Sequence, residues 1–153
     1  MKVKDLMTVD PRTCSPGTTL AEAAHLMWNA DCGILPVVEA GKLVGVVTDR
    51  DMYIALATRN QQPAMLTVGA VATPTVSTCE PEDDLSAALK TMKTAQVRRL
   101  PVVGFGGSVL GILSIDDVVR AAGPRKLVTS DEVLDTLQAI YAHHHPLPEV
   151  VVV

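Results

Sequence analysis

The stretch Leu35-Pro36-Val37-Val38 is repeated as Leu100-Pro101-Val102-Val103, and this repetition decides the fold. The longer stretch Gly45-Val46-Val47-Thr48-Asp49-Arg50-Asp51 matches Gly111-Ile112-Leu113-Ser114-Ile115-Asp116-Asp117 in the same way. The first pair is offset by 65 positions (35 to 100) and the second by 66 (45 to 111), so the second copy has one additional loop residue. Because apolar and polar positions recur together, the sequence predicts one structural unit used twice.

Each copy is predicted to run in the order strand, helix, strand, strand, helix. Extended segments at 12–14 and 77–79 come first. Thr19 and Glu22 are spaced as a capping box at the start of the first helix, and Asp84 is the expected N-cap in the second copy. Two apolar strands follow, joined by a turn short enough for an antiparallel hairpin, and a second helix closes the copy.

The predicted fold class is therefore α/β (α+β), with two such repeats packed sheet to sheet in approximate twofold symmetry. A sheet of two or three strands leaves an apolar face bare, so we expect the two sheets to share one core. Residues 1–58 form the first repeat, 59–66 a polar connector, 67–122 the second repeat, and 123–153 a C-terminal helix and tail.

The C-terminal helix is predicted from a capping box formed by Thr129 and Glu132. Its predicted apolar face consists of Val133, Leu134, Leu137, Ile140 and Tyr141. The run of three histidines at 143–145 could bind a metal ion, but it has no acidic or cysteine partners nearby. We interpret it as part of a tail and expect no metal site.

Composition narrows the function classes. Hydrophobic residues make up 48% of the 153 residues and aromatic ones only 3%, so the core must be aliphatic. The net charge of −4 and the lack of a basic block argue against a nucleic-acid partner. No apolar run reaches the roughly 18 residues of a membrane helix, and the first residues lack the apolar stretch of a signal peptide.

The cysteines and histidines give little support for catalysis. Three cysteines without metal-type spacing fit a cytoplasmic location better than a disulfide framework. Cys14 and Cys79 hold equivalent positions in the two copies, so we interpret them as small core residues, with a redox pair as the alternative. No Ser/His/Asp or Cys/His set recurs, so we expect neither enzymatic activity nor a required cofactor.

The two Gly-x-x-[Ser/Thr]-x-x-Asp segments, each preceded by Leu-Pro-Val-Val, resemble those of a tandem pair of cystathionine-β-synthase-type regulatory domains (CBS domains). The resemblance extends from Val3 to Arg120. It implies a stand-alone ligand sensor that binds AMP, ADP, ATP or S-adenosylmethionine in clefts between the repeats. It also implies a disc-like homodimer that regulates an unidentified partner protein. The alternative is an interaction module whose clefts stay empty.

The resemblance gives the strand–helix junctions a role. Asp51 and Asp117 would each accept hydrogen bonds from two ribose hydroxyls, as only a carboxylate can. The hydroxyls of Thr48 and Ser114, with free backbone N–H groups at the helix starts, would face a phosphate. The alternative is that each pair, three residues apart, is only a capping box like that of Thr19 and Glu22.

The other predicted contacts serve the adenine and the phosphate. The resemblance assigns the adenine to the strand starts and to two extended segments, namely Gly33, Ile34, Leu35, Pro36, Arg98, Arg99, Leu100, Pro101, Thr13, Cys14, Thr78 and Cys79. Guanidinium groups suit a phosphate, and the candidates are Arg50, Arg98, Arg99 and Arg120, with solvated surface charges as the alternative. The two copies differ at these positions, so we expect two clefts of unequal affinity.

Overall fold

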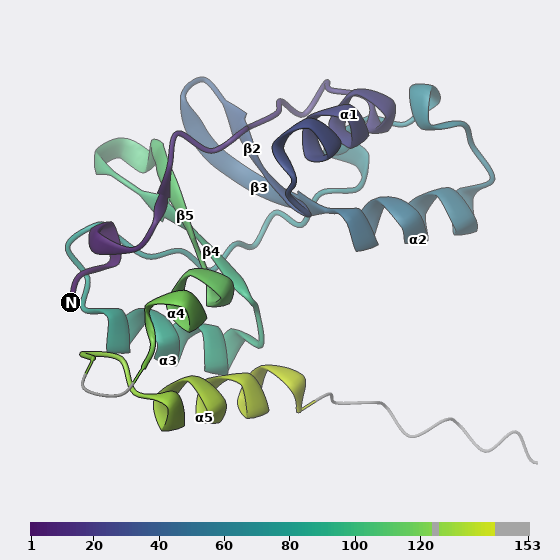
Figure 1. Cartoon of the computed structure of the whole chain (residues 1–153). Helices are drawn as coiled ribbons and strands as arrows, with labels where there is room; N and C mark the ends of the chain where they lie inside the picture. Colours follow the sequence, from purple (N-terminus) through teal and green to yellow (C-terminus); the bar gives the residue numbers. More distant parts are fainter. Residues whose placement is uncertain (124–125, 143–153) are drawn as a thin grey trace, which may run out of the picture.

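The computed structural model describes residues 1–123 and 126–142, and its elements follow the two copies of the repeat (Figure 1). The first repeat contains α1 (Leu20–Ala30), β2 (Ile34–Glu39), β3 (Lys42–Thr48) and α2 (Asp49–Arg59). The second contains α3 (Leu85–Ala95), β4 (Arg99–Val103), β5 (Val109–Ser114) and α4 (Ile115–Ala121). Outside this pattern lie β1 (Thr8–Val9), α5 (Ser130–Tyr141) and one-turn 3₁₀ helices at Val3–Asp5, Pro63–Met65, Val68–Ala70 and Phe105–Gly107.

The first helix of each repeat begins at the capping residue predicted from the sequence. The Thr19 hydroxyl accepts from the Glu22 N–H at 3.2 Å, and Glu22 Oε2 accepts from the Thr19 N–H at 2.8 Å. This reciprocal pair confirms the capping box of α1. Asp84 does occupy the N-cap of α3, but its side chain makes no capping bond. The Asp84 carboxylate instead accepts from Lys2 Nζ at 2.9 Å, so the predicted N-cap position is confirmed, but the side chain does not cap the helix.

The strands form two small sheets. β2 and β3 make an antiparallel hairpin, and β4 and β5 make a second one to which β1 adds an edge. The predicted strands at 12–14 and 77–79 are reduced to single bridges, from Cys14 to Val37 and from Cys79 to Val102. Pro16 and Pro81 follow two residues later and lack the N–H that a longer ladder would need.

The segments that lead into the two repeats are exchanged. Residues 1–9 lie against the second repeat, where the Val3 N–H donates to Asp83 O at 3.0 Å and β1 pairs with β5. The chain after Leu66 lies against the first repeat in the same way, where the Val68 N–H donates to Thr18 O at 2.7 Å. Each repeat is therefore completed by chain that belongs to the other in the sequence, and the two halves interlock.

The buried side chains form two clusters, so the prediction of one shared core is wrong. The first cluster packs β2 and β3 against α1 and α2 and takes in Leu66 and Val68. The second packs β4 and β5 against α3, α4 and α5 and takes in Val3. Each hairpin is covered by the helices of its own cluster.

The predicted C-terminal helix is present as α5, but its inner face differs from the prediction. Val133, Thr136 and Ile140 are the buried residues, whereas Leu134 is 54% exposed. Thr136 is tolerated inside because its hydroxyl donates to Glu132 O at 2.7 Å. Within the described ranges, no helix has the length and apolar character needed to cross a membrane. The predicted histidine tail lies outside the described residues.

Candidate functional site: a cleft between the repeats

A cleft of about 620 Å³ lies between the two repeats. The end of β3 and the first turn of α2 form one side, and the end of α3 and the start of β4 form the other. Thr73 and residues 75–77, in the chain that links the repeats, also line it. The lining residues are Gly33, Ile34, Val46, Thr48, Asp49, Arg50, Asp51, Thr73, Thr75, Val76, Ser77, Ala95, Gln96, Val97, Arg98, Arg99, Pro101, Ile140 and Tyr141.

The structure brings one group of the sequence-predicted residues together in this cleft. That group is Gly33, Ile34, Thr48, Arg50, Asp51, Arg98, Arg99 and Pro101. The remaining predicted residues do not line it, and they are Thr13, Cys14, Leu35, Pro36, Thr78, Cys79, Leu100, Ser114, Asp117 and Arg120. Leu35 and Leu100 are fully buried in the two clusters, because alternate residues of a strand face opposite sides of the sheet.

Asp51 holds the start of α2 with only one of its two carboxylate oxygens. Its Oδ2 accepts from the Thr48 N–H at 3.0 Å and from the Thr48 hydroxyl at 2.7 Å. The hydroxyl accepts in turn from the Asp51 N–H at 3.1 Å. Thr48 and Asp51 thus form the capping box of the alternative prediction. Oδ1, by contrast, accepts no hydrogen bond from any described residue, so it is available to a ligand.

The start of α2 offers no free backbone donors, which corrects the prediction for the phosphate. The Asp49 N–H donates to Gly33 O at 3.2 Å, and the Arg50 N–H donates to Asp49 Oδ1 at 2.8 Å. The Asp51 N–H and the Thr48 hydroxyl are both used in the capping box. An anion in this cleft would therefore depend on side-chain cations.

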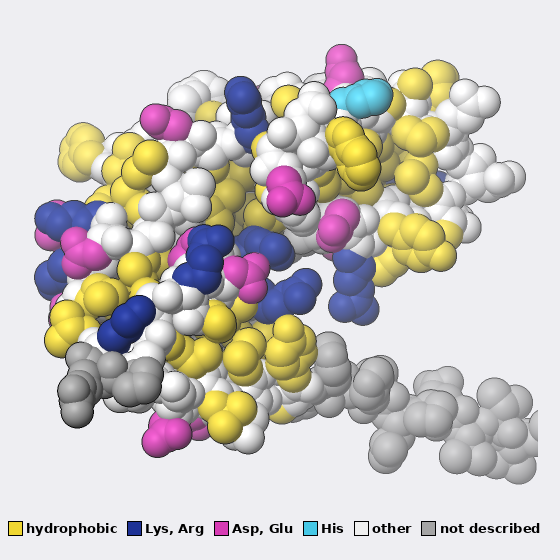
Figure 2. All heavy atoms as spheres, in the orientation of Figure 1, with side chains coloured by type: hydrophobic (Ala, Val, Ile, Leu, Met, Phe, Trp, Pro, Cys, Tyr) yellow, Lys and Arg dark blue, Asp and Glu magenta, His cyan; other side chains and the backbone are white. Residues whose placement is uncertain are grey.

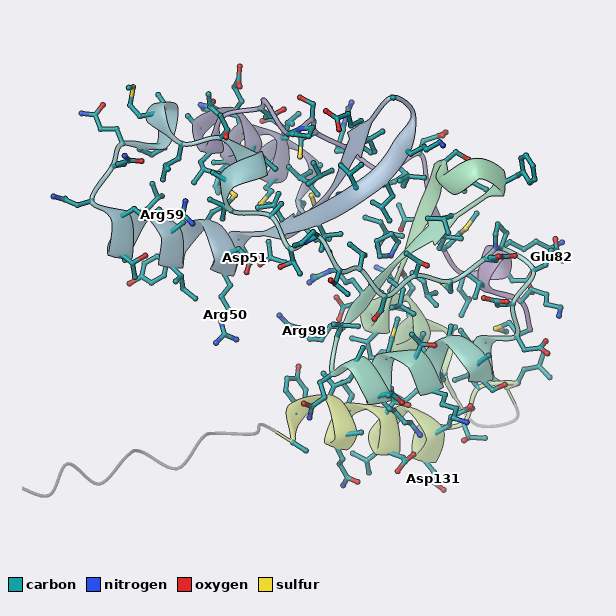
Figure 3. The ribbon with its side chains drawn as sticks, turned by 180° about the vertical axis from the view of Figure 1, so that it is seen from behind. Arg50, Asp51, Arg59, Glu82, Arg98 and Asp131 are labelled. Carbon is teal, nitrogen blue, oxygen red and sulfur yellow. The ribbon has the colours of Figure 1, made fainter. Side chains whose placement is uncertain are left out.

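Arginines supply those cations. In Figure 3, Arg50 at the start of α2 and Arg98 ahead of β4 point toward the same open space from opposite repeats. Neither forms an ion pair with any residue that the structure places. A guanidinium nitrogen of Arg99 lies 4.0 Å from Asp116 Oδ2. Arg99 is more buried than Arg50 and Arg98, with 28% of its side chain exposed. Figure 2 shows dark blue side chains around the hollow between the two halves.

Gly33 lines the cleft beside the Asp49 side chain. A Cβ atom at this position would lie 2.8 Å from Asp49 Oδ2, which real side chains do not allow without a shift. The equivalent residue of the second repeat is Arg98, so the two repeats are not interchangeable here. The difference gives the cleft a guanidinium on one side and bare backbone on the other.

The equivalent residues of the second repeat are arranged differently. Ser114 and Asp117 form the same capping box, with the Ser114 N–H 2.9 Å from Asp117 Oδ2. The other carboxylate oxygen of Asp117 accepts from Arg120, and the side chain is only 7% exposed. Arg120 is thus paired with Asp117, the carboxylate that was expected to hold a ribose. The strand–helix junctions of the two repeats are therefore unequal in the structure.

Sequence reasoning missed several residues of the cleft. Thr73, Thr75 and Ser77 lie on the segment leading into the second repeat, and the offset of 65 could have identified them as counterparts of residues 8–12. Gln96, Ile140 and Tyr141 are different, because they lie at the end of α3 and the end of α5, which Gln96 joins by hydrogen bonds. Nothing in the spacing of the repeat points to them.

The described part of the chain holds no group of three or more His, Cys, Asp or Glu side chains suited to a metal ion. The three cysteines are free, with Cys14 and Cys79 buried and Cys32 half-buried. The absence of a catalytic set stays a prediction.

Comparison with known proteins places this architecture in a family. The CBS domain family matches residues 3–58 and 68–123. The CBS domain-containing protein YhcV of Bacillus subtilis is 39% identical over 117 residues, which cover 76% of this chain and 81% of that protein. A solved CBS domain pair in complex with 5′-methylthioadenosine and S-adenosyl-L-methionine has a TM-score of 0.72 and 28% identity, covering 78% of this chain and 94% of its own. The solved complex of CBSX2 with AMP has a TM-score of 0.68 and 30% identity, again covering 78% of this chain and 94% of its own. With both repeats matched in sequence and in structure, the chain belongs to the CBS domain family.

Proposed function

We propose that this chain is a sensor that binds an adenine nucleotide in the cleft between its repeats and regulates a partner protein. The observation that carries the proposal is the unused Oδ1 of Asp51, held at the cleft by a capping box that occupies only Oδ2. A fixed carboxylate oxygen facing a cleft is suited to accept hydrogen bonds from ribose hydroxyls. Relatives solved with AMP and with S-adenosyl-L-methionine support the ligand class.

The phosphate end of the ligand would lie between Arg50 and Arg98. Both line the cleft, and neither is neutralised by a described acidic group within ion-pair distance. Guanidinium groups form charge-assisted, bidentate hydrogen bonds with phosphate oxygens. Because the chain as a whole is acidic, local arginines must supply the positive charge that binds the phosphate. The adenine would pack against the apolar part of the lining, formed by Ile34, Val46 and Pro101.

A thermal-shift screen with AMP, ADP, ATP and S-adenosylmethionine tests the ligand class. A ligand present at 100 times its dissociation constant stabilises the folded chain by about 2.7 kcal/mol, which raises the melting temperature measurably. No shift with any of the four would contradict the proposal and favour the interaction module with empty clefts.

Asp51→Asn tests the placement. An asparagine keeps one oxygen for the capping box and replaces Oδ1 with a donor, so α2 should form while ribose recognition is lost. Hydrogen bonds to a charged group contribute about 1.5–3 kcal/mol, so calorimetric titration should show affinity reduced by about 10- to 100-fold.

The matched control is Asp117→Asn. It changes the same position of the same capping box in the other repeat, away from this cleft. We expect it to leave the affinity of the Asp51 cleft unchanged. Equal losses in both variants, or no loss in Asp51→Asn, would show that the site is misplaced.

A further inference from the structure

α5 is an addition to the repeated unit. It begins at Ser130, after the second family match ends at 123, whereas the first repeat has only the one-turn 3₁₀ helix Pro63–Met65 after α2. Figure 1 shows α5 lying along α3 on the outer side of the second repeat. Val133 and Ile140 are buried in the second cluster, and Lys93 of α3 forms an ion pair with Asp135.

A side-chain amide fastens the C-terminal end of α5 beside the cleft. Gln96 Nε2 donates to Ala139 O at 3.2 Å and to Ala142 O at 2.6 Å. They are carbonyls of the last turn of α5 and of its C-cap, and such carbonyls have no partners within the helix. Gln96 is also the left-handed C-cap of α3 and itself lines the cleft.

The first repeat has no such device. The counterpart of Gln96 is Asp31, which caps α1 in the same left-handed conformation. A carboxylate cannot donate a hydrogen bond to a helix carbonyl, so Asp31 could not hold a helix in this way. The asymmetry between the repeats therefore includes the residue that brings α5 to the site.

The consequence is that the last turn of α5 forms part of the cleft wall. Ile140 and Tyr141 both line it, with Ile140 5% exposed and Tyr141 53% exposed. The chain has only four aromatic residues, and Tyr141 is the one among the described lining residues. The aliphatic residues Ile140 and Val97 line the same cleft, so the end of α5 and the chain just after α3 contribute apolar residues and an aromatic ring to its wall.

We propose that Tyr141 is a ligand-binding residue whose ring packs against the bound nucleotide, and that α5 is consequently stabilised when the cleft is filled. The inference rests on the proposed function, because it concerns the same ligand. Aromatic rings contribute strongly to nucleotide binding by stacking, with little dependence on the identity of the base. Since Tyr141 is 53% exposed in the free chain, a bound molecule can cover part of its surface.

Calorimetric titration of AMP into the wild type, Tyr141→Ala, Tyr141→Phe and Leu134→Ala tests the proposal. Loss of the ring should reduce affinity by about 5- to 100-fold in Tyr141→Ala, the range for one stacking aromatic side chain. Tyr141→Phe keeps the ring and should bind within about twofold of the wild type. Leu134 is exposed on α5 and does not line the cleft, so Leu134→Ala should bind like the wild type.

Hydrogen exchange gives an independent readout. With saturating AMP, the amides of α5 should exchange more slowly in the wild type, and this protection should be lost in Tyr141→Ala. Unchanged affinity in Tyr141→Ala, or an equal loss in Leu134→Ala or in Tyr141→Phe, would overturn the proposal. If the wild type binds AMP and only Asp51→Asn weakens it, this inference fails alone. If the wild type binds no adenine nucleotide, the proposed function fails and takes this inference with it.

Discussion

Cys14 and Cys79 show how burial fixes the chemistry of a residue. They are 7% and 5% exposed in the two clusters, and both are free. Burial raises the pKa of the Cys14 thiol from 9.0 to about 11. Burial, with a smaller contribution from Asp83, raises the pKa of the Cys79 thiol to about 12. Because the thiolate is the reactive form, these residues behave as small apolar side chains.

Alkylation should therefore distinguish the three cysteines. At pH 8 we expect iodoacetamide to label half-buried Cys32 in the native chain and to leave Cys14 and Cys79 unmodified, with all three labelled in urea. Mass spectrometry of peptides measures each site. Protection of Cys14 and Cys79 should weaken above pH 9. In that range their thiols lose protons in the unfolded chain but keep them in the folded chain, so the free energy of unfolding falls as the pH rises. Rapid native labelling of Cys14 at pH 8 would contradict this.

At the scale of elements, two glycines allow the leading segments to reach the hairpins. A Cβ atom on Gly45 would lie 2.9 Å from Thr73 O, and one on Gly111 would lie 2.7 Å from Thr8 O. These backbone contacts belong to the bridge between Val46 and Thr73 and to the pairing of β1 with β5. The recurrence of glycine in both copies thus has a steric reason, which is the close approach of two chains.

Gly45→Ala should push this contact apart. Inserting a methyl group into a packed contact typically costs about 1–3 kcal/mol, so the urea midpoint should fall. Because Thr73 lines the cleft, ligand affinity should fall as well. Gly17→Ala is the matched control, since its nearest neighbouring atom lies 4.0 Å from the added Cβ. If Gly45→Ala were as stable as Gly17→Ala, the segment around Thr73 would have to move away without loss of stability, and the prediction would be wrong.

At the scale of the whole molecule, α5 makes the two helical faces unequal. Leu89 of α3 is 1% exposed in the cluster that α5 completes, whereas its counterpart in α1, Ala24, is exposed. Large apolar side chains remain exposed on the helices of the first repeat, with Trp28 at 85% and Tyr53 at 74%. We propose that the chain forms a homodimer through this uncovered face of α1 and α2, since exposed apolar patches mark interaction surfaces.

Trp28→Glu should shift a dimer toward monomer, because it places a charge where an apolar contact is expected. Sedimentation velocity at micromolar concentration measures the distribution. Phe105→Glu serves as the control, because Phe105 is even more exposed than Trp28 but lies in the hairpin loop of the second repeat. A wild type that sediments as a monomer would contradict the proposal, as would a dimer that Trp28→Glu leaves intact.

The sequence by itself determined the repeated unit and the positions where its helices begin. Capping boxes and hairpin turns are local, so Thr19, Thr48 and Ser114 could be identified from spacing alone. The same reasoning located Asp51 at a strand–helix junction. It could not tell that one carboxylate oxygen would be used for capping and the other left free, because that depends on the rotation of a side chain among its neighbours.

Only the tertiary structure decided which chain segments meet. The exchange of the leading segments, the packing within each of the two clusters and the contribution of α5 to the cleft wall all depend on contacts between residues far apart in the sequence. Two copies of nearly the same pattern became unequal because Arg120 pairs with Asp117, while Asp51 faces a cleft bordered by Arg50. Local patterns specify elements, whereas contacts over long separations depend on how those elements pack, and the site was made by that packing.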